Sequence, residues 1–418
     1  MQTGLIQNAH NDLVTDAAYD YYGLRLATSG LDQRLKVWAL DEQSGSWIAT
    51  HDWKAHDAAV TKICWAHPEF GSIIASSSFD RTVKIWEELL ADTEQPQVNG
   101  ASGVPSGSRW VERAVITEAK GSVRAVEFAP HHFGLKLATI SSDNILRIYE
   151  CLETPTLSNW PLSEEVDVLS LTYAPASLSH PHTVAMTTPT QTHSALDGPT
   201  ASLVASALQQ HQPHLPNRPG VGNREADGGW CISWCKDRYW GEVIAAGASV
   251  TGIVKIIQIS PSRRPTTLFT LDPSPQADQA ATSATASASD AEVPQLASVT
   301  SVAWAPSCGR SYHLVATGSR DGHVRIWKLK PPAYDEERAQ TEDNTWTGVQ
   351  VADFDHHKGA VGRVEWNVTG TVLSSAGNDG RVRLWKATQG NVWRAAGHIS
   401  VEQAEDAHKE GDVEMDES

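Results

Sequence analysis

One short pattern recurs six times along the chain and constrains the fold more than any other feature. Each copy has a turn residue, two further turn positions, an apolar residue, Lys or Arg, another apolar residue and a large closing residue. The copies are DQRLKVW (32–38), DRTVKIW (80–86), DNILRIY (143–149), TGIVKII (251–257), DGHVRIW (321–327) and DGRVRLW (379–385). Alternation of this kind behind a polar turn is typical of a β-strand and not of a helix. Apolar runs before each turn add two more strands, and a fourth candidate follows most copies.

Repeated units of four short antiparallel strands are typical of WD40 β-propellers. We therefore predict an all-β fold, a six-bladed WD40 propeller over residues 1–400 with four strands per blade. The copies lie further apart than the usual repeat of about 40–45 residues, which requires insertions in loops. The predicted insertions, whose composition favours mobility, are 89–108, 174–228, 272–295 and 331–346, and an acidic disordered tail follows at 401–418.

The first strand of the fourth blade has two candidates. LSLTYAP (169–175) and WCISWC (230–235) both have the apolar pattern of an innermost strand. We favour the second, because its distance from the following frame matches the distance in the fifth unit.

The polar residues of the frame are expected to hold each blade together. In WD repeats the turn Asp, a Ser or Thr on the second strand, a His ahead of the first strand and the Trp form a buried hydrogen-bonded set. In the second copy Ser76 and Ser77 are both candidates for the hydroxyl. The predicted structural residues are Asp32, Trp38, His56, Asp80, Trp86, Asp143, Tyr149, Asp321, Trp327, Asp379 and Trp385. The fourth copy has Thr251 and Ile257 instead of Asp and Trp, so its blade is expected to rest on packing.

Composition and missing motifs exclude several classes of function. A formal net charge of −17 argues against a broad basic face for nucleic acid. The five cysteines contain no C-x-x-C pair, so we expect buried, reduced thiols and no metal site. No run approaches the roughly 20 apolar residues of a membrane span, so membrane association would be indirect. Nucleophile elbow, P-loop, HExxH and dinucleotide motifs are absent, which predicts a protein that is not an enzyme and has no cofactor.

The six units leave open how the ring closes. Each blade is complete within itself, and no strand remains to latch the ends together. Either six blades close tightly, or the ring stays open and a partner inserts strands between blades one and six. The residues we place near that slot are His10, Asp12, Leu13, Asp16, Asn378, Asp379 and Arg381. His10 and Asp379 are equally suited to the internal sets of their own blades.

Several long stretches resemble the Seh nucleoporin family. They are WAHPEFGSIIASSSFDRTVKIWEE (65–88), LATISSDNILRIYECLETPTLSNWPL (137–162), GRSYHLVATGSRDGHVRIWKLKP (309–331) and DFDHHKGAVGRVEWNVTGTVLSSAGNDGRVRLWKA (353–387). The resemblance implies an open propeller that a helical scaffold nucleoporin completes in trans with a donated blade. It implies a scaffold subunit of the Y-shaped complex of the nuclear pore, at the nuclear envelope, serving protein and mRNA transport with other Y-complex subunits. It also implies a place in a SEA/GATOR-type coat complex that regulates TORC1 at the vacuolar or lysosomal membrane.

Two alternatives remain beside this hypothesis. The stretch HNDLVTDAAYDYYGLRLATSGLDQRLKVW (10–38) also fits the sister family, the Sec-type WD protein of the COPII coat, although WEELLADTEQ (86–95) and SNWPL (158–162) follow the Seh pattern. A peptide-reading WD40 adaptor is the other alternative, with Arg81, Arg320 and Arg381 beside turns where they could contact phosphate. Solvated turn residues are the simpler interpretation of these arginines.

Overall fold

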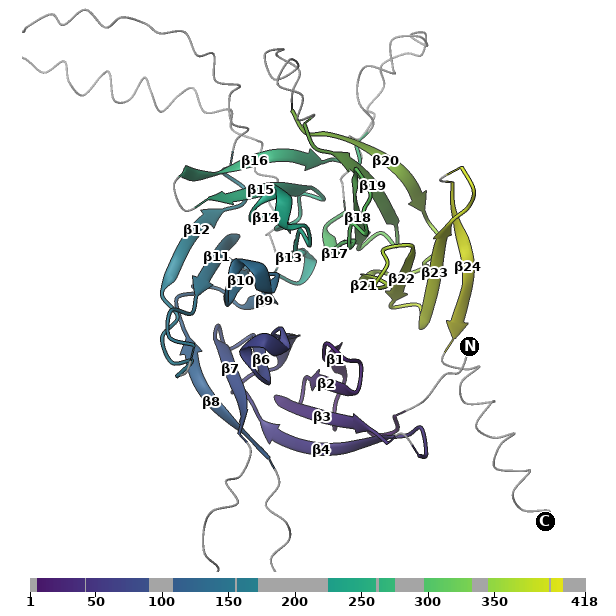
Figure 1. Ribbon diagram of the computed structural model, residues 1–418. Helices are drawn as coiled ribbons and strands as arrows, with labels where there is room; N and C mark the ends of the chain where they lie inside the picture. The colour runs from purple at the N-terminus through teal and green to yellow at the C-terminus, as the bar shows by residue number, and fades with distance from the viewer. Residues whose placement is uncertain are drawn as a thin grey trace, which may run out of the picture. The chain divides into compact units, whose positions relative to one another are not determined.

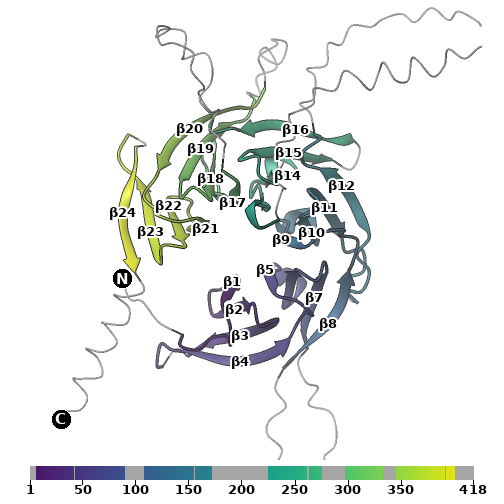
Figure 2. The same ribbon diagram turned by 180° about the vertical axis from the view of Figure 1, so that it is seen from behind.

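The computed structural model describes nine stretches of the chain: 6–41, 43–89, 108–154, 156–171, 225–260, 263–274, 297–332, 345–390 and 392–400. The chain divides into two compact units, residues 1–174 with 225–418, and residues 175–224, the second of which lies outside the described residues. The first unit contains six four-stranded antiparallel sheets that follow one another around a ring (Figures 1 and 2). This confirms the predicted six-bladed propeller, and we number its sheets as blades 1 to 6.

The strands of the six blades are as follows. Blade 1 contains β1 (Val14–Tyr19), β2 (Arg25–Gly30), β3 (Arg34–Leu40) and β4 (Trp47–Lys54), and blade 2 contains β5 (Val60–Trp65), β6 (Ile73–Ser78), β7 (Val83–Leu89) and β8 (Arg109–Ile116). Blade 3 contains β9 (Val123–Phe128), β10 (Lys136–Ser141), β11 (Ile145–Glu150) and β12 (Leu162–Asp167), and blade 4 contains β13 (Cys231–Trp234), β14 (Val243–Gly247), β15 (Val254–Ser260) and β16 (Arg263–Leu271). Blade 5 contains β17 (Val299–Trp304), β18 (His313–Ser319), β19 (Val324–Lys330) and β20 (Thr347–Phe354), and blade 6 contains β21 (Val361–Trp366), β22 (Val372–Gly377), β23 (Arg381–Ala387) and β24 (Trp393–Ser400).

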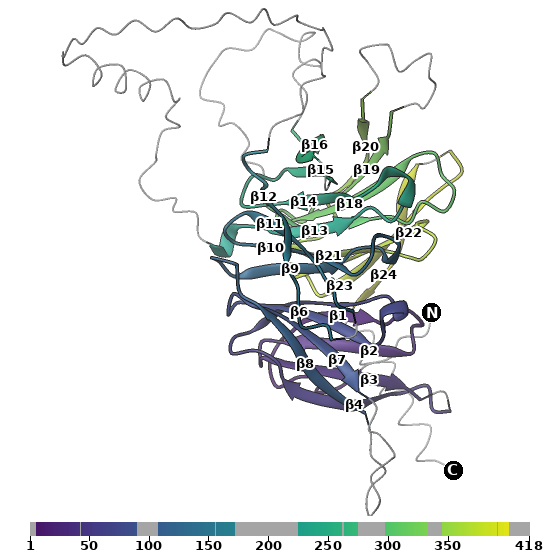
Figure 3. The same cartoon turned by 60° about the vertical axis from the view of Figure 1, so that its left-hand side comes forward.

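Within each blade the strands are hydrogen-bonded in chain order. Figure 3 shows this order in blade 1, where β1 to β4 succeed one another from the interior of the ring to its periphery. The innermost strand of blade 4 is Cys231–Trp234, so the second of the two candidates is correct. The four 3₁₀ turns of the described chain are Pro68–Phe70, His131–Phe133, Glu225–Asp227 and Arg238–Trp240.

The turn of each frame has one backbone conformation in all six blades. The residue after the frame Asp or Thr has a positive φ, and these residues are Gln33, Arg81, Asn144, Gly252, Gly322 and Gly380. In blade 2 the Asp80 carboxylate accepts a hydrogen bond from the backbone N–H of Thr82 at 2.9 Å. An Asx turn of this kind supplies the tight reversal that joins the second and third strands. The recurring Asp therefore has a local role before any role in packing.

The apolar core lies between neighbouring blades. Five clusters of buried residues each join two consecutive blades, from blades 1 and 2 to blades 5 and 6. Every residue of the second strand is buried in blades 2 to 5. Each of these strands therefore has a neighbouring blade on both of its faces.

Most of the predicted insertions fall outside the described residues, as does the whole tail, 401–418. Two of their boundaries need adjustment: Leu89 belongs to β7, and Glu225–Asp227 forms a 3₁₀ turn. The expectation of buried thiols is wrong for Cys308, which is exposed in the turn between β17 and β18 with a φ of 44°. The spacing of the cysteines gave no indication of this exposure.

Candidate partner-binding site

The most regular polar feature of the blades is a buried set of hydrogen bonds. In blade 2, His56 Nδ1 lies 2.9 Å from Asp80 Oδ2, and His56 Nε2 lies 2.8 Å from Ser76 Oγ. Trp86 Nε1 donates to the same hydroxyl at 2.9 Å, so Ser76 and not Ser77 occupies the hydroxyl position. Burial raises the pKa of Asp80, but the hydrogen bonds that it accepts, from His56 first, outweigh burial and hold the pKa well below its ordinary value.

Blade 1 has the same arrangement, built from the N-terminal segment. His10 Nδ1 lies 3.0 Å from Asp32 Oδ1, and His10 Nε2 lies 2.9 Å from Thr28 Oγ1. Trp38 Nε1 donates to Thr28 Oγ1 at 2.9 Å. The His10 side chain is fully buried, so it serves the interior of blade 1.

Blade 6 has the third complete set. His357 Nδ1 lies 3.0 Å from Asp379 Oδ1, and both His357 Nε2 and Trp385 Nε1 lie 2.8 Å from Ser375 Oγ. Arg383 Nη1 donates to Asp379 Oδ2 at 2.8 Å. Burial lowers the pKa of His357, and this outweighs the opposing hydrogen bond to Asp379. Burial raises the pKa of Asp379, but its bonds to His357 and Arg383 hold that pKa far below its ordinary range.

Blade 3 replaces the His with an arginine. Arg147 Nη2 donates to Asp143 Oδ2 at 2.9 Å, and Arg147 Nη1 donates to Ser141 Oγ at 2.9 Å. The Tyr149 hydroxyl, at the position of the frame Trp, donates to Glu118 Oε2 at 3.4 Å. The guanidinium thus connects the turn Asp to the second strand, which a His does in blade 2.

Blades 4 and 5 keep less of the set. In blade 5, Trp327 Nε1 donates to Thr317 Oγ1 at 3.2 Å. Arg325 donates to Ser319 Oγ at 3.1 Å and lies 3.5 Å from Asp321 Oδ2, as Arg147 does with the corresponding groups in blade 3. In blade 4, Ile257 is fully buried in the cluster with blade 3, and Thr251 caps its turn. The described residues of blade 4 form no His–Ser–Asp–Trp set, so this blade rests on apolar packing, as its sequence predicts.

Blades 6 and 1 meet at a junction that differs from the other five. None of the five apolar clusters joins these two blades, and no described strand of one pairs with a strand of the other. Among the described residues, all hydrogen bonds across the junction come from one side chain. Arg363 Nη1 lies 2.5 Å from Asp16 Oδ1 and donates to Ala17 O at 2.6 Å. A single arginine therefore stands where every other junction has an apolar cluster.

Blade 6 presents a half-exposed apolar face to this junction. Leu373 and Trp385 are paired across β22 and β23 and pack against blade 5. Side chains alternate along a strand, so the residues between them point the other way. We call these residues the open face of blade 6: Ser374, Ala376, Val382, Leu384 and Ile399. None of them is buried, and Val382 is 38% exposed.

Blade 1 contributes the opposite wall of the junction. Tyr19, Leu26 and Trp38 are register partners on one face of β1, β2 and β3 and belong to none of the five clusters. In blade 2 the corresponding Trp86 packs against blade 1, so in blade 1 this face points to blade 6. Tyr19 is 59% exposed and contacts Trp47 with ring centroids 5.7 Å apart. Leu26 and Trp38 are each only 7% exposed, so Tyr19 is the member of this group that offers exposed apolar surface.

Three of the predicted slot residues have their side chains inside the propeller. The exposed fractions of the side chains are 0% for His10, 2% for Asp16 and 9% for Asp379. Asp16 binds Lys62 Nζ at 3.2 Å and accepts the backbone N–H of Ile63 at 3.0 Å, besides its contact with the arginine. Each of the three serves a neighbouring strand or its own blade.

The other four predicted slot residues are exposed and lie in two groups. Asp12 and Leu13 precede β1, and Leu13 is 72% exposed. Asn378 and Arg381 lie at the turn between β22 and β23, where the Asn378 N–H donates to Ala360 O of the same blade at 2.8 Å. No hydrogen bond in the described chain joins the two groups. The open face itself was missed, although the alternating Val382 and Leu384 of the sixth frame carried the signal for it.

The described residues give no indication of a metal site or a membrane span. They contain no group of three or more His, Cys, Asp or Glu suited to a metal ion. Within the same stretches, no helix has the length and apolar character required to cross a bilayer. Burial raises the pKa of Cys64, Cys231 and Cys235 to about 12, so these thiols stay protonated.

Comparison with known proteins agrees with the fold and is specific about the family. The WD domain, G-beta repeat model matches residues 3–39, 46–87, 294–328 and 348–386, which contain the frames of blades 1, 2, 5 and 6. A chain in the crystal structure of the mitotic checkpoint complex is similar with a TM-score of 0.50 at 12% identity, over 90% of this chain and 75% of that chain, which supports the fold alone.

Curated relatives match at higher identity over nearly the whole length. Nucleoporin SEH1 of Saccharomyces cerevisiae is 33% identical over 95% of this chain and 99% of its own length. Nucleoporin seh1 of Schizosaccharomyces pombe is 30% identical over 95% and 96%, and human Nucleoporin SEH1 is 33% identical over 93% and 85%. The chain therefore belongs to the SEH1 family of nucleoporins, and it is a WD-repeat scaffold protein and not an enzyme.

Proposed function

We propose that this nucleoporin is a scaffold subunit of the Y-shaped complex of the nuclear pore, and that a helical scaffold nucleoporin completes its ring in trans. The partner would insert strands between blades 6 and 1. The observation that supports this proposal is the open face of blade 6, which has no apolar cluster against blade 1 although the other five junctions have one. As a nucleoporin, the protein has its place in the nuclear pore complex at the nuclear envelope.

One face of the blade 6 sheet has no neighbouring blade to cover it. Blades 2 to 5 have a neighbour on each face, but Val382 and Leu384 remain partly in contact with water. Burying apolar surface stabilises an assembly by roughly 25 cal/mol per Å². A donated blade would cover both walls of the junction, and its strands could be supplied by strand addition. Asp12, Leu13, Asn378 and Arg381 would then lie at the rim of the interface, and His10, Asp16 and Asp379 would support it from within.

The test introduces a charge on the open face. Val382→Glu puts a carboxylate where the partner strand would pack, and Val349→Glu puts the same charge on β20, where Val349 is 58% exposed. We expect the first variant to lose co-purification with the strand-bearing N-terminal segment of the helical nucleoporin, and the second to keep it. Both should melt within a few degrees of the unaltered chain, because both positions are exposed in the free protein.

The same experiment can reject the proposal. If Val382→Glu binds the partner segment as tightly as Val349→Glu does, the open face is not the contact. Removal of the partner segment provides a second arm, since the proposal requires that assembly fails without it.

The resemblance to the Seh family also supports membership of a SEA/GATOR-type coat complex that regulates TORC1 at the vacuolar or lysosomal membrane periphery. Affinity purification with mass spectrometry would test this, with pore-scaffold and coat-complex subunits as the two expected sets. The family assignment favours these partners over the COPII coat. The peptide-reading alternative is weakened, because Arg320 Nη2 already donates a hydrogen bond to the Ala226 carbonyl.

A further inference from the structure

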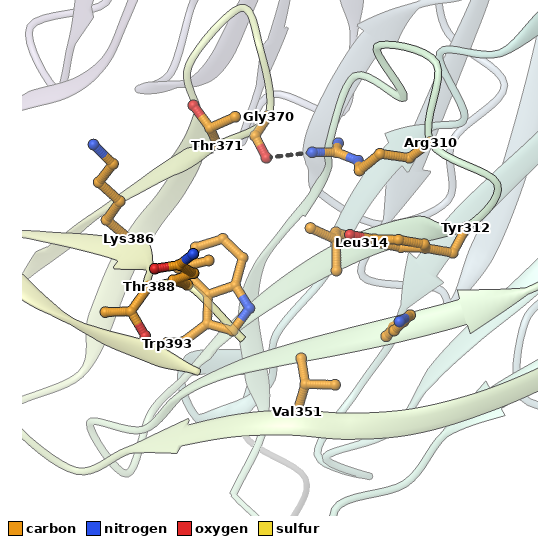
Figure 4. A pocket seen from close by; sticks show the side chains of 12 residues that line it. Arg310, Tyr312, Leu314, Val351, Gly370, Thr371, Lys386, Thr388 and Trp393 are labelled. Atoms are coloured by element: carbon orange, nitrogen blue, oxygen red, sulfur yellow. Dashed lines mark hydrogen bonds between the residues drawn. The ribbon is translucent and has the colours of Figure 1, made fainter. Parts of the chain in front are cut away.

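A second concave site lies between blades 5 and 6, on the covered side of blade 6. It is a cavity of about 400 Å³ (Figure 4). Its lining residues come from the β17–β18 and β21–β22 loops, from strands β18 to β20, and from the β23–β24 hairpin. They are Arg310, Tyr312, Leu314, Lys328, Val351, Gly370, Thr371, Lys386, Ala387, Thr388, Gln389 and Trp393. This cavity is separate from the junction of blades 6 and 1, so it does not depend on the proposed function.

The charge of the cavity is opposite to that of the whole protein. Arg310, Lys328 and Lys386 line it, and no carboxylate does, whereas the chain as a whole carries a formal charge of −17. Within the described chain neither lysine forms an ion pair, and Lys328 Nζ lies 4.1 Å from the centre of the Tyr312 ring. Three cationic groups without a carboxylate leave a local positive potential.

Arg310 is held in place without being neutralised. Its Nη1 donates to Gly370 O at 2.9 Å and its Nη2 donates to Pro306 O, both of them uncharged carbonyls. Its Nε is buried and has no hydrogen-bond partner among the described residues. Figure 4 shows the Arg310 side chain and its bond to Gly370 at the edge of the cavity. The guanidinium is therefore oriented by the loops of two blades and keeps its charge for a ligand.

Part of the remaining lining is apolar, beside the polar Thr371, Thr388 and Gln389. Leu314 and Trp393 are buried members of the cluster between blades 5 and 6, and Val351 packs against that cluster. Figure 4 shows Trp393 and Val351 below Arg310 and Lys386. A small anion alone would leave this apolar surface uncovered. The combination suits a carboxylate next to an aliphatic or aromatic side chain.

We propose that the cavity between blades 5 and 6 binds an acidic peptide segment of a partner protein. A Glu or Asp side chain of that segment lies among Arg310, Lys328 and Lys386, and a neighbouring apolar side chain packs on Trp393 and Val351. Charge-assisted contacts of this kind are about twice as strong as neutral ones, and they fix the register of the peptide.

The test measures peptide binding to the full chain by fluorescence anisotropy. The probe is a fluorescein-labelled octapeptide of alternating Glu and Leu, and the control probe has Gln in place of Glu. The double variant Lys328→Met, Lys386→Met removes two charges but keeps most of the aliphatic stems. The matched control is Lys358→Met, an exposed lysine between β20 and β21 that does not line the cavity.

The proposal predicts that the acidic probe binds at least tenfold more weakly to the double variant, while Lys358→Met changes its affinity less than twofold. The Gln probe should bind weakly to every protein, and the affinity of the acidic probe should fall between 50 and 300 mM NaCl. Equal binding of the acidic probe to the unaltered chain and the double variant would overturn the proposal. So would tighter binding of a peptide with the sequence of residues 401–418, which would assign the cavity to the chain's own tail, or saturation by inorganic phosphate, which would assign it to a small anion.

Discussion

The two faces of blade 6 differ in how far neighbouring residues cover them. On the face toward blade 5, Leu373 and Trp385 are fully buried. On the face toward blade 1, Ala376, Val382 and Leu384 are only partly covered, although they belong to the same strands and have the same hydrogen-bonded register. Backbone pairing is thus common to both faces, and the difference comes entirely from the neighbouring blade. A blade can thus be fully formed as a sheet while one of its two faces stays partly exposed.

The largest expected effect comes from truncating one adjacent residue on each face. Trp385→Ala leaves a cavity in the cluster with blade 5 and deprives Ser375 Oγ of a donor, so it should lower the free energy of unfolding by about 3–5 kcal/mol. Leu384→Ala removes a side chain that already touches water and should cost about 1 kcal/mol or less. Urea unfolding followed by tryptophan fluorescence would measure both.

The comparison shows whether the two faces differ in their contribution to the free energy of unfolding, as they differ in burial. If Leu384→Ala costs as much as Trp385→Ala in the free chain, blade 1 covers the open face in solution. If Leu384→Ala becomes costly only when the partner segment is present, a partner supplies the cover.

A smaller effect is expected from the polar set on the buried face, and it depends on pH. The folded-state pKa of Asp379 is below its ordinary value, so its contribution to stability is present above about pH 4 and is lost as the pH falls further. The folded-state pKa of His357 is also lowered, so the unfolded chain takes up a proton below about pH 6.5 that the folded chain resists. Both groups therefore make blade 6 less stable in acid.

Asp379→Asn separates these contributions. At pH 7 the variant should lose about 1–3 kcal/mol, because Arg383 Nη1 is left without a carboxylate. Between pH 5 and 3 its unfolding free energy should fall less steeply than that of the unaltered chain. An equal slope in both proteins, measured by urea unfolding at each pH, would mean that this carboxylate does not govern the acid sensitivity.

Much of the fold follows from local patterns, and for that reason it could be predicted from the sequence. The frame at 80–86 specifies a turn through Asp80 and a strand through Val83 and Ile85, which alternate with Lys84. Both are short-range effects. The same local reasoning, applied to Thr251 and Ile257 of the fourth frame, predicted that blade 4 would lack the polar set. The polar set of blade 3 was harder to predict, because Arg147, which lies inside the frame, makes the contacts that a His makes in blade 2.

The site was harder to predict because it is defined by what is absent around it. Val382 and Leu384 look like the interior of any blade strand, and only the ring tells which face lacks a neighbour. His10 and Asp379 were chosen for their place in the chain, but local hydrogen bonds place them in the internal sets of blades 1 and 6. A cross-blade contact such as that between Arg363 and Asp16, at the two ends of the chain, leaves no mark in a sequence pattern.

The smallest expected effect on stability tests the junction itself. Arg363→Met removes the one side chain whose hydrogen bonds cross from blade 6 to blade 1 in the described chain, and Asp16 keeps its contacts with Lys62 and Ile63. The loss should be about 1 kcal/mol, because the Arg363 side chain is 30% exposed and the buried Asp16 carboxylate keeps its two other partners. Arg113→Met is the matched control, because Arg113 pairs with Glu87 inside blade 2 and is 29% exposed, against 30% for Arg363.

Hydrogen–deuterium exchange distinguishes the two variants where stability does not. Arg363→Met should speed exchange of amides in β1 and β21, the innermost strands on the two sides of the junction, because no apolar cluster holds these blades together once the arginine is gone. Arg113→Met should leave both strands unchanged. Protection of β1 and β21 that survives Arg363→Met would mean that the junction is held by contacts other than this ion pair. The ring would then be closed in the free protein, and the two faces of blade 6 would be equally covered.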